Sequence, residues 1–352
     1  MSDKSNRVYR ECTPTANWKR CLTVGIVLIL LAGLVSACGP AAAAPVPQKT
    51  GGTGPSYAGK KILFVNSYHQ GYEWSDGIEA GLKKVLDGTG AELKIVRLDT
   101  KQNPAEEFCM QAGVKAKAEI DSFRPDVVIA ADDNAQKCLV VPFLKDQTVP
   151  VIFCAVNWDA SMYGYPTSNM TGMIEVELPG QLVEHLKAYA RGQRLAYLTV
   201  DSETERKVAQ IYNERFFDGK MAVYWVKTYD EFKQAFLNSQ KDVDILFFGN
   251  NAGMDRWDEN EAKAFIQQNT KIPTGTINSW LAGFVLLTLA KSADEQGEWS
   301  AQAALRILDG TPPSKIPVVE NKKGEIIVNL DLAEQLGVVF SPSILKNAKV
   351  FK

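Results

Sequence analysis

The sequence predicts an α/β fold in which two doubly wound parallel-sheet lobes are joined by a hinge. From residue 60 onward, short runs rich in β-branched residues alternate with amphipathic stretches of helical length. This alternation indicates parallel sheets covered by helices on both faces. It restarts near residue 180, and the turn-rich segment 163–171 (YGYPTSNMT) separates the two series. Two successive doubly wound units are the simplest account of this pattern.

The individual elements follow from where each apolar run lies and how it is spaced. Runs of four to six apolar residues indicate buried strands, and longer stretches with apolar residues three or four apart indicate helices. The first series has predicted strands at 62–66, 93–98, 127–131 and 151–154 and helices at 76–86, 105–123 and 135–143. The second has strands at 195–200, 222–225 and 245–248 and helices at 180–190, 204–217, 231–238 and 259–268. Helices at 281–293 and 301–308 and strands at 316–319 and 325–329 complete the prediction.

Length and charge exclude some classes of protein. The chain has 352 residues, 45% of them hydrophobic and 23% charged, which suits a globular protein of about two domains. Its formal charge is −2, and removal of the basic N-terminal segment makes it more acidic. Such a chain lacks the basic surface that nucleic acid requires, so we expect no nucleic-acid partner.

The N-terminal segment has the features of a bacterial export signal. A basic stretch precedes the uncharged run 21–37, and Val35-Ser36-Ala37-Cys38 resembles the lipobox of bacterial lipoproteins. That resemblance implies a signal peptide at 1–37 and a diacylated Cys38 carrying fatty acids such as palmitate. An uncleaved N-terminal anchor helix is the alternative. We expect an extracytoplasmic protein anchored to a bacterial membrane, in the periplasm or on the outer cell surface.

We predict that residues 38–57 form a lipidated, flexible tether. Segment 39–57 consists mainly of Ala, Pro, Gly, Ser and Thr, a composition that cannot bury a core. Beyond it the cysteines are Cys109, Cys138 and Cys154, an odd number that allows one disulfide at most. With no CxxC pair, a zinc or redox site is not indicated, and we expect these cysteines to act as small buried hydrophobes.

Polar and aromatic residues follow several predicted strands. Ligands of open α/β sheets bind beyond the carboxyl ends of the strands, so these positions are the candidate site. The candidates are Tyr68, His69 and Trp74 after the first strand, Asp132, Asp133 and Asn134 after the third, and Asn157 and Trp158 after the fourth, followed in the second series by Asp201, Ser202, Asn250, Asn278 and Trp280.

Each candidate has both a binding role and a structural alternative. Asp132 or Asp133 could hold a ligand amine or hydroxyl by a charge-assisted hydrogen bond, or could cap the helix that follows. The rings of Tyr68, His69 and Trp74 could stack on a flat or cationic ligand. The alternative is that Trp74 fixes the entry of the first helix and His69 bonds the backbone. Asp201 and Ser202 could bind an anionic group at a helix N-terminus, or could serve as caps. Turn formation is the alternative for Asn157.

Several segments resemble a known family, the ABC-transporter substrate-binding proteins whose better characterised members take up tryptophan or tyrosine. The first segment, ILFVNSYHQGYEWSDGI, is similar to the branch found as sensor domains of histidine kinases. The other similar segments are VVIAADDNA at 127–135, VIFCAVNWD at 151–159, MTGMIEVE at 170–177, and the C-terminal run from LRILDGTPPSKIPVV at 305–319 through IIVNLDLAEQLGVVFSPSILKNA at 326–348.

The family's type I periplasmic-binding-protein fold implies three hinge crossings, near 165–171, 274–278 and 310–315. Lobe 1 would then contain residues 58–168 and 277–310, and lobe 2 would contain residues 169–276 and 311–352. Closure of the hinge around the ligand is the motion that the resemblance implies.

The resemblance implies a binding protein that is not an enzyme. The expected ligand is a small organic molecule, with an aromatic amino acid or a similar amine as the first choice, and the expected partner is an ABC permease. A sensory role, in which the closed form contacts a histidine kinase or chemoreceptor, is the alternative. The chain contains no GxSxG, HExxH or GxxxxGK[ST] motif and only two histidines, His69 and His185. We expect a monomer with no cofactor and no metal.

Overall fold

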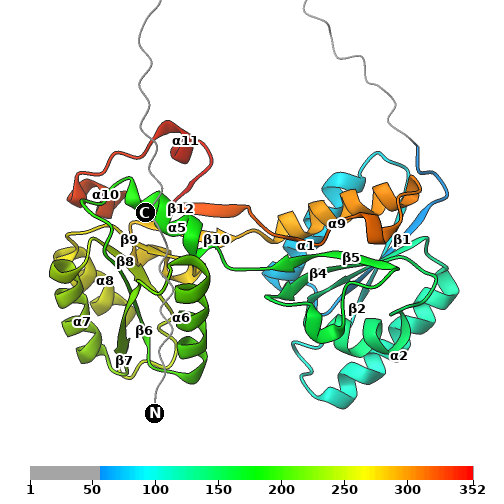
Figure 1. Cartoon of the computed structure of the whole chain (residues 1–352), viewed down its shortest axis with the longest axis horizontal. Coiled ribbons are helices and arrows are strands. Elements are labelled where there is room, and N and C mark those ends of the chain that lie inside the picture. Colours follow the sequence, from blue (N-terminus) through cyan, green and yellow to red (C-terminus); the bar gives the residue numbers. More distant parts are fainter. Residues whose placement is uncertain (1–55, 352) are drawn as a thin grey trace, which may run out of the picture. The chain divides into compact units, whose positions relative to one another are not determined.

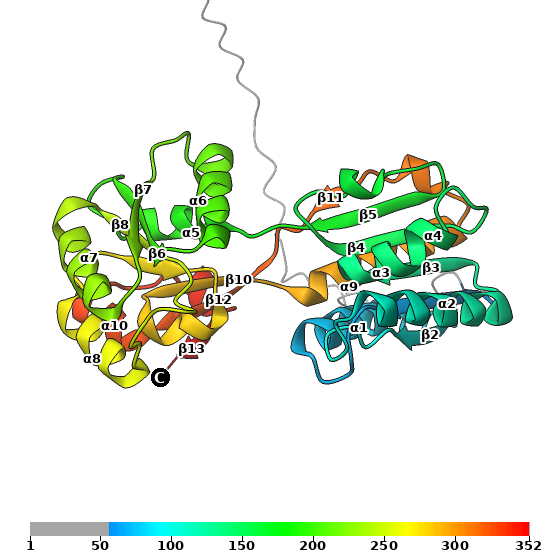
Figure 2. The ribbon, with the colours of Figure 1, turned by 90° about the horizontal axis from the view of Figure 1, so that it is seen from below.

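The computed structural model describes residues 56–351, which form two parallel-dominated sheets flanked by helices (Figures 1 and 2). This confirms the predicted α/β class with two doubly wound lobes. The signal peptide at 1–37 and the predicted lipidation site Cys38 lie outside the described residues. No helix within residues 56–351 is both long and apolar enough to cross a membrane.

Lobe 1 is built on a six-stranded sheet with the order β11-β5-β4-β3-β1-β2. Every neighbouring pair is parallel, with Ile62 opposite Val127 between β1 and β3. The strands are β1 (Lys61–Asn66), β2 (Glu92–Arg97), β3 (Val127–Ala131), β4 (Val151–Asn157), β5 (Met170–Glu175) and β11 (Val319–Glu320).

Helices cover both faces of this sheet because its central strands are apolar on both sides. Along β1, Ile62 and Phe64 belong to one buried cluster and Leu63 and Val65 to another, as the period of two in a strand requires. The first cluster includes residues of α1 (Glu73–Leu86) and α9 (Ala293–Leu308). The second packs under α2 (Glu106–Phe123), α3 (Asp132–Ala135), the π-helical turn η1 (Gln136–Val140) and α4 (Val141–Phe143), with η2 (Ser161–Tyr163) and η4 (Pro313–Lys315) completing the lobe.

Lobe 2 is built on a seven-stranded sheet with the order β13-β12-β10-β9-β8-β6-β7. Its pairs are parallel except for β10 with β12, which run antiparallel. The strands are β6 (Leu195–Val200), β7 (Ala222–Val226), β8 (Ile245–Phe248), β9 (Thr274–Thr276), β10 (Leu287–Lys291), β12 (Gly324–Asn329) and β13 (Lys349–Phe351).

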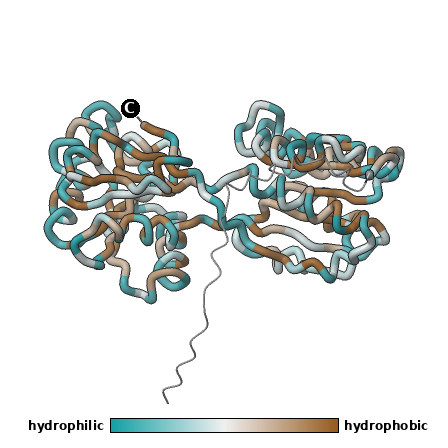
Figure 3. Tube along the Cα trace, turned by 90° about the horizontal axis from the view of Figure 1, so that it is seen from above, coloured by the Kyte–Doolittle hydropathy of each residue, from teal (hydrophilic) through white to brown (hydrophobic). Residues whose placement is uncertain are grey.

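The helices of lobe 2 also divide between two faces. Figure 3 shows apolar residues gathered along the strands and polar residues at the connecting loops. One face carries α5 (Pro179–Lys187), α6 (Glu203–Phe216), α10 (Leu330–Leu336) and α11 (Pro342–Leu345). The opposite face carries α7 (Tyr229–Asp242), α8 (Glu259–Asn269) and the 3-10 segment η3 (Ser279–Phe284).

The predicted helix at 281–293 is wrong. The chain instead forms η3 and then the buried strand β10. A continuous apolar run fits a strand covered on both faces as well as it fits a helix, so its spacing alone did not separate the two. The predicted strand at 316–319 overlaps the short β11 (Val319–Glu320) only at Val319. The helix predicted at 301–308 is the second half of α9, which begins at Ala293.

The chain crosses between the lobes later than the predicted boundaries. Strand β5 pairs with β4 in the first sheet, so the first crossing follows Glu175. The second lies between β10 and α9, and the third lies between β11 and β12. The crossing was predicted within the turn-rich segment 163–171, but β5 begins at Met170, and at Gly172 it passes against the Phe153 ring, which leaves no room for a side chain.

The folded body already includes Tyr57, which was assigned to the tether. Tyr57 is 8% exposed, its hydroxyl donates to both carboxylate oxygens of Asp309 at 3.0 Å, and its amide donates to the Thr89 carbonyl at 2.9 Å. The prediction that the cysteines are small buried hydrophobes holds for Cys154 alone within residues 56–351, because Cys109 and Cys138 form a disulfide between α2 and η1.

Helix α9 packs backbone to backbone against α1. A Cβ atom at Gly81 would overlap the carbonyl oxygen of Asp294, and one at Gly297 would overlap the carbonyl oxygen of Ile78. Glycine at these positions therefore allows α9, which follows a strand of lobe 2 in the sequence, to complete the helical layer of lobe 1.

Candidate functional site

The carboxyl ends of the parallel strands of lobe 1 lie at one edge of its sheet. Tyr68 follows β1, Asp132 and Asp133 follow β3, and Asn157 and Glu175 end β4 and β5. The ends of β3 and β4 are in contact, because Asn157 Nδ2 donates to Asp133 Oδ2 at 2.9 Å. This edge therefore gathers several candidates that are far apart in the sequence.

Asp132 combines burial, backbone strain and an unpaired oxygen. The residue is 3% exposed, its φ is 66°, and its Oδ2 atom has no hydrogen-bond partner within residues 56–351. Burial raises its pKa well above the ordinary range, Glu175 and Asp133 add to this, and Trp74 and Lys101 act in the opposite direction. A left-handed backbone is costly for a residue other than glycine and is concentrated at functional sites.

The two residues after Asp132 are engaged with neighbours. Asp133 accepts a hydrogen bond from Asn157 Nδ2 at 2.9 Å and another from the Tyr163 hydroxyl at 2.8 Å. The Asn134 amide donates to Thr100 Oγ1 at 2.9 Å. None of the three aspartate or asparagine side chains caps α3, so the capping alternative does not account for them.

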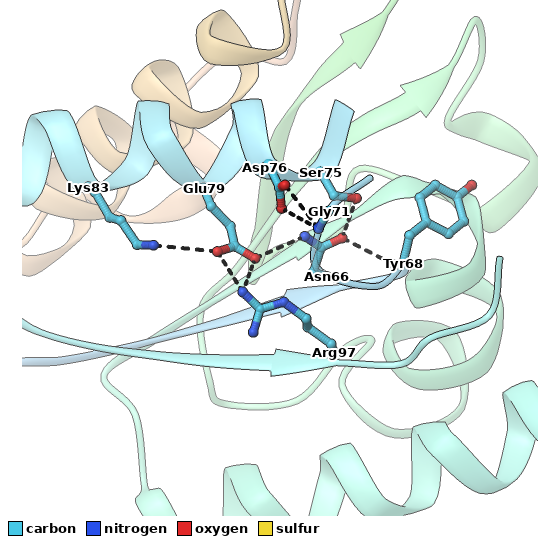
Figure 4. Close-up of polar contacts among 8 residues, drawn as sticks. All are labelled: Asn66, Tyr68, Gly71, Ser75, Asp76, Glu79, Lys83 and Arg97. Atoms are coloured by element: carbon cyan, nitrogen blue, oxygen red, sulfur yellow. Dashed lines mark hydrogen bonds and ion pairs between the residues drawn. The ribbon is translucent and has the colours of Figure 1, made fainter. Parts of the chain in front are cut away.

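A buried polar cluster fixes the loop that presents Tyr68 (Figure 4). Asn66 Oδ1 accepts from the Tyr68 amide at 3.2 Å and from Ser75 Oγ at 2.9 Å, which ties the end of β1 to α1. The Glu79 carboxylate, 3.4 Å from Asn66 Nδ2, accepts two bonds from Arg97 at 2.6 and 2.7 Å. Asn66, Ser75 and Glu79 are buried and position the loop, which makes them supporting residues of the candidate site.

Aromatic rings surround the loop. The Tyr68 and Tyr72 rings meet edge to face at 5.2 Å, and Lys101 Nζ lies 5.1 Å from the Tyr68 ring centre. Burial, and then the charge of Asp132, raise the pKa of the Tyr68 hydroxyl, so it stays a neutral donor. His69 Nδ1 is buried and has no partner in the described part of the chain.

Three charged residues at the crossings escaped the sequence prediction. Lys291, at the end of β10, contacts the Glu175 carboxylate and lies 2.6 Å from Glu177 Oε1. Its Nζ atom is 5.3 Å from the centre of the Trp74 ring. Although burial lowers the pKa of Lys291, Glu175 and Glu177 hold it above the ordinary value. A correct assignment of β5 and β10 as strands would have drawn attention to these positions.

In lobe 2, the side chains of Asp201, Ser202 and Asn250 form hydrogen bonds or ion pairs with residues close to them in the sequence. Asp201 pairs with Arg206 at 2.7 Å, and Ser202 caps α6 by accepting from the Glu205 amide at 3.1 Å. Asn250 Oδ1 accepts from the Ala252 amide at 2.9 Å and so forms a turn. Ser202 thus has the capping role weighed for it, whereas Asp201 forms an ion pair and not a cap.

The remaining candidates lie near the crossings. Trp158 is half-buried and has a backbone φ of 58°. Its ring centre is 6.1 Å from that of the Tyr212 ring. Asn278 and the 62% exposed Trp280 line a groove together with Trp74, Glu177 and Lys291. Within residues 56–351, no cluster of His, Cys, Asp and Glu has the arrangement of a metal site.

Comparison with known proteins supports this architecture. The family model of the ABC transporter substrate binding protein matches residues 266–352. No curated protein matches the sequence.

Several solved structures share the fold. The ligand-free, open structure of a substrate binding protein with adhesive properties from Clostridium difficile has a TM-score of 0.62 at 19% identity, with 83% of this chain and 99% of that chain covered. An ABC transporter solute binding protein from Bradyrhizobium, with bound bis-tris, has a TM-score of 0.51 at 14% identity, covering 82% and 90%. A periplasmic ribose ABC transporter protein from Conexibacter woesei has a TM-score of 0.50 at 18% identity, covering 81% and 95%. The family match at the C-terminal end and the shared two-lobed fold together confirm the predicted resemblance to the ABC transporter substrate-binding proteins.

Proposed function

We propose that this chain is an extracytoplasmic lipoprotein that captures a small organic amine between its lobes and delivers it to an ABC importer. The observation that carries the proposal is Asp132, whose buried carboxylate oxygen lacks a partner at the edge of the sheet where ligands of such folds bind. A ligand ammonium would supply the missing hydrogen bond and the opposite charge.

The rings near Asp132 favour an aromatic ligand. Tyr68 is half-buried beside the acidic edge, and Trp74 and Trp280 line the neighbouring groove. Flat apolar surfaces next to a few convergent polar groups are typical of small-molecule sites. An aromatic amino acid or a related amine is therefore our first choice of ligand.

The lipid anchor is proposed from the sequence around Cys38. Two or more acyl chains hold a protein far more firmly at a membrane than one does, which would keep the binding protein near its permease. Metabolic labelling with a fatty acid tests the anchor, and an unlabelled mature protein would exclude it. A sensory role remains the second candidate, because the segment Ser67-Tyr68-His69 resembles the sensor-like branch. A neighbouring permease gene favours import, and a neighbouring kinase gene favours sensing.

The first experiment is a thermal-shift screen with aromatic amino acids and their decarboxylated amines, followed by calorimetry on the best probe. A ligand at 100 times its dissociation constant stabilises a protein by about 2.7 kcal/mol, which such a screen detects. We expect Asp132→Asn to weaken binding by roughly 1.5–3 kcal/mol, the value of a charge-assisted hydrogen bond.

Asp201→Asn is the matched control, since it makes the same chemical change where the carboxylate is already paired with Arg206. It should leave the dissociation constant unchanged. Equal affinity of wild-type protein and Asp132→Asn for the best probe would remove Asp132 as the ligand anchor.

A further inference from the structure

Lys291 lies where the chain passes from lobe 2 into α9 and contacts acidic groups of another crossing. Its Nζ atom contacts Glu175 at the end of β5 and is 2.6 Å from Glu177 Oε1, just beyond that strand. The Glu175 side chain is 7% exposed, and those of Lys291 and Glu177 are each 23% exposed. Solvent screens this cluster only partly, so its charges act strongly on one another.

The lysine occupies two features that a cationic ligand group would also use. One is the Glu175 carboxylate, which interacts with Asp132 and Asp133 across the ends of the strands. The other is the Trp74 ring, whose centre is 5.3 Å from Lys291 Nζ, within the range of a cation–π contact. Lys291 therefore stands where a second ligand ammonium would bind.

The crossings do not depend on this lysine alone. The Asn321 side chain accepts from the Val176 amide at 2.7 Å and donates to the Val176 carbonyl at 3.0 Å, and Asn321 is 3% exposed. Glu295 accepts from the amides of Lys322 and Lys323 at 2.9 and 2.6 Å. These contacts to main-chain groups already join the crossing segments, so Lys291 is not their only link.

We propose that Lys291 determines specificity by restricting the site to ligands with one cationic group. The inference rests on the proposed amine anchor at Asp132, whose buried Oδ2 atom is unpartnered in the described residues. With Lys291 in place, Glu175 and Glu177 share its ammonium group, and Asp132 accepts a single ligand ammonium. Without Lys291, the two glutamates would accept a second.

The test compares two probes that differ by one amino group, 4-methylbenzylamine and p-xylylenediamine. Wild-type protein should bind the monoamine more tightly. Lys291→Met should increase the affinity for the diamine relative to the monoamine by at least about tenfold, the effect of one charge-assisted hydrogen bond. Lys291→Arg keeps the charge and should keep the wild-type preference, which separates loss of charge from misfolding.

Lys349→Met is the control for a lysine elsewhere on the same groove, where it pairs with Glu325 at 2.6 Å. It should behave as the wild-type protein does. An unchanged preference in a folded Lys291→Met protein overturns the role of Lys291 while leaving the amine anchor intact. If wild-type protein binds neither probe and Asp132→Asn does not alter binding of any ligand, the anchor fails, and this inference fails with it.

Discussion

The strand ends of the two lobes carry similar residue types but use them differently. In lobe 1, Asp132 is buried, has a left-handed backbone and keeps one oxygen unpaired in the described structure. In lobe 2, Asp201 is paired with Arg206 and Ser202 caps α6. An aspartate that follows a strand therefore indicates a binding site only when one of its oxygens lacks a hydrogen-bond partner. A paired or capping residue already has a structural role.

At the strand ends, lobe 1 thus holds an unpaired aspartate oxygen, whereas Asp201 and Ser202 of lobe 2 are both paired. Energetically costly groups persist only where the surrounding structure holds them firmly. In lobe 1, the Cys109–Cys138 disulfide and the bonds around Asn66 supply such support close to the candidate site. Substitutions in each lobe test this difference between the two sets of strand ends.

The largest expected effect comes from the disulfide. Replacing Cys109 and Cys138 by Ala should destabilise lobe 1 by roughly 3–4 kcal/mol, since the bridge closes a loop of 29 residues. Because both cysteines lie in lobe 1, calorimetry should show its transition moving to lower temperature, away from that of lobe 2. Wild-type protein under reducing conditions is the control. A uniform shift of one transition would mean that the lobes unfold together.

A smaller effect is expected from the ligand-free Asp132→Asn protein. Asparagine tolerates a left-handed backbone and carries no charge to bury, so the variant should be roughly 1–2 kcal/mol more stable at neutral pH. The pKa of Asp132 is raised above its unfolded value, so the folded state retains a proton that the unfolded state has released. Wild-type stability therefore falls as pH rises from about 4 toward the folded pKa, and the advantage of the variant grows over that range.

Urea denaturation at several pH values between 4 and 8 measures this difference, with Asp201→Asn as the control. A stability gain that is the same at every pH would assign the effect to the backbone alone. A loss of stability would show that the Asp132 carboxylate supports the fold of lobe 1.

The smallest effect is expected at the cap of α6. Ser202→Ala removes the bond to the Glu205 amide and should cost about 1 kcal/mol of stability. Thr228→Ala, at the cap of α7, should cost a similar amount because Thr228 accepts from the Glu231 amide. Neither change should alter ligand affinity in calorimetry. A weaker affinity in Ser202→Ala alone would give lobe 2 a direct part in binding.

Much of the fold could be predicted from the sequence because its strands are short apolar runs between amphipathic helices. Strands β1, β3, β6 and β8 lie where the β-branched and aromatic runs indicated. Strands β5, β9 and β13 were not predicted, and β10 was predicted as part of a helix. The start of β5 lies in the turn-rich segment 163–171, and β10 continues an apolar run that also suits a helix.

The failures at β5 and β10 explain what was missed at the site. Glu175 ends β5 and Lys291 ends β10, so neither was recognised as a residue at a strand end. Asp132 was found because its strand was correctly assigned. Its unpaired oxygen and positive φ depend on the packing of β3 against β1 and β4, which no local sequence pattern encodes.

The packing of α9 against α1 also constrains the order in which the protein folds. Lobe 1 needs Gly297 against Ile78 to close one face of its sheet, and α9 also contributes Ala301 and Ala304 to that core. A growing chain that has reached only β10 has all of the central strands of lobe 1 but lacks this helix. Contacts between segments so distant in the sequence form slowly. Lobe 1 therefore stays incomplete until α9, which ends at Leu308, has been synthesised.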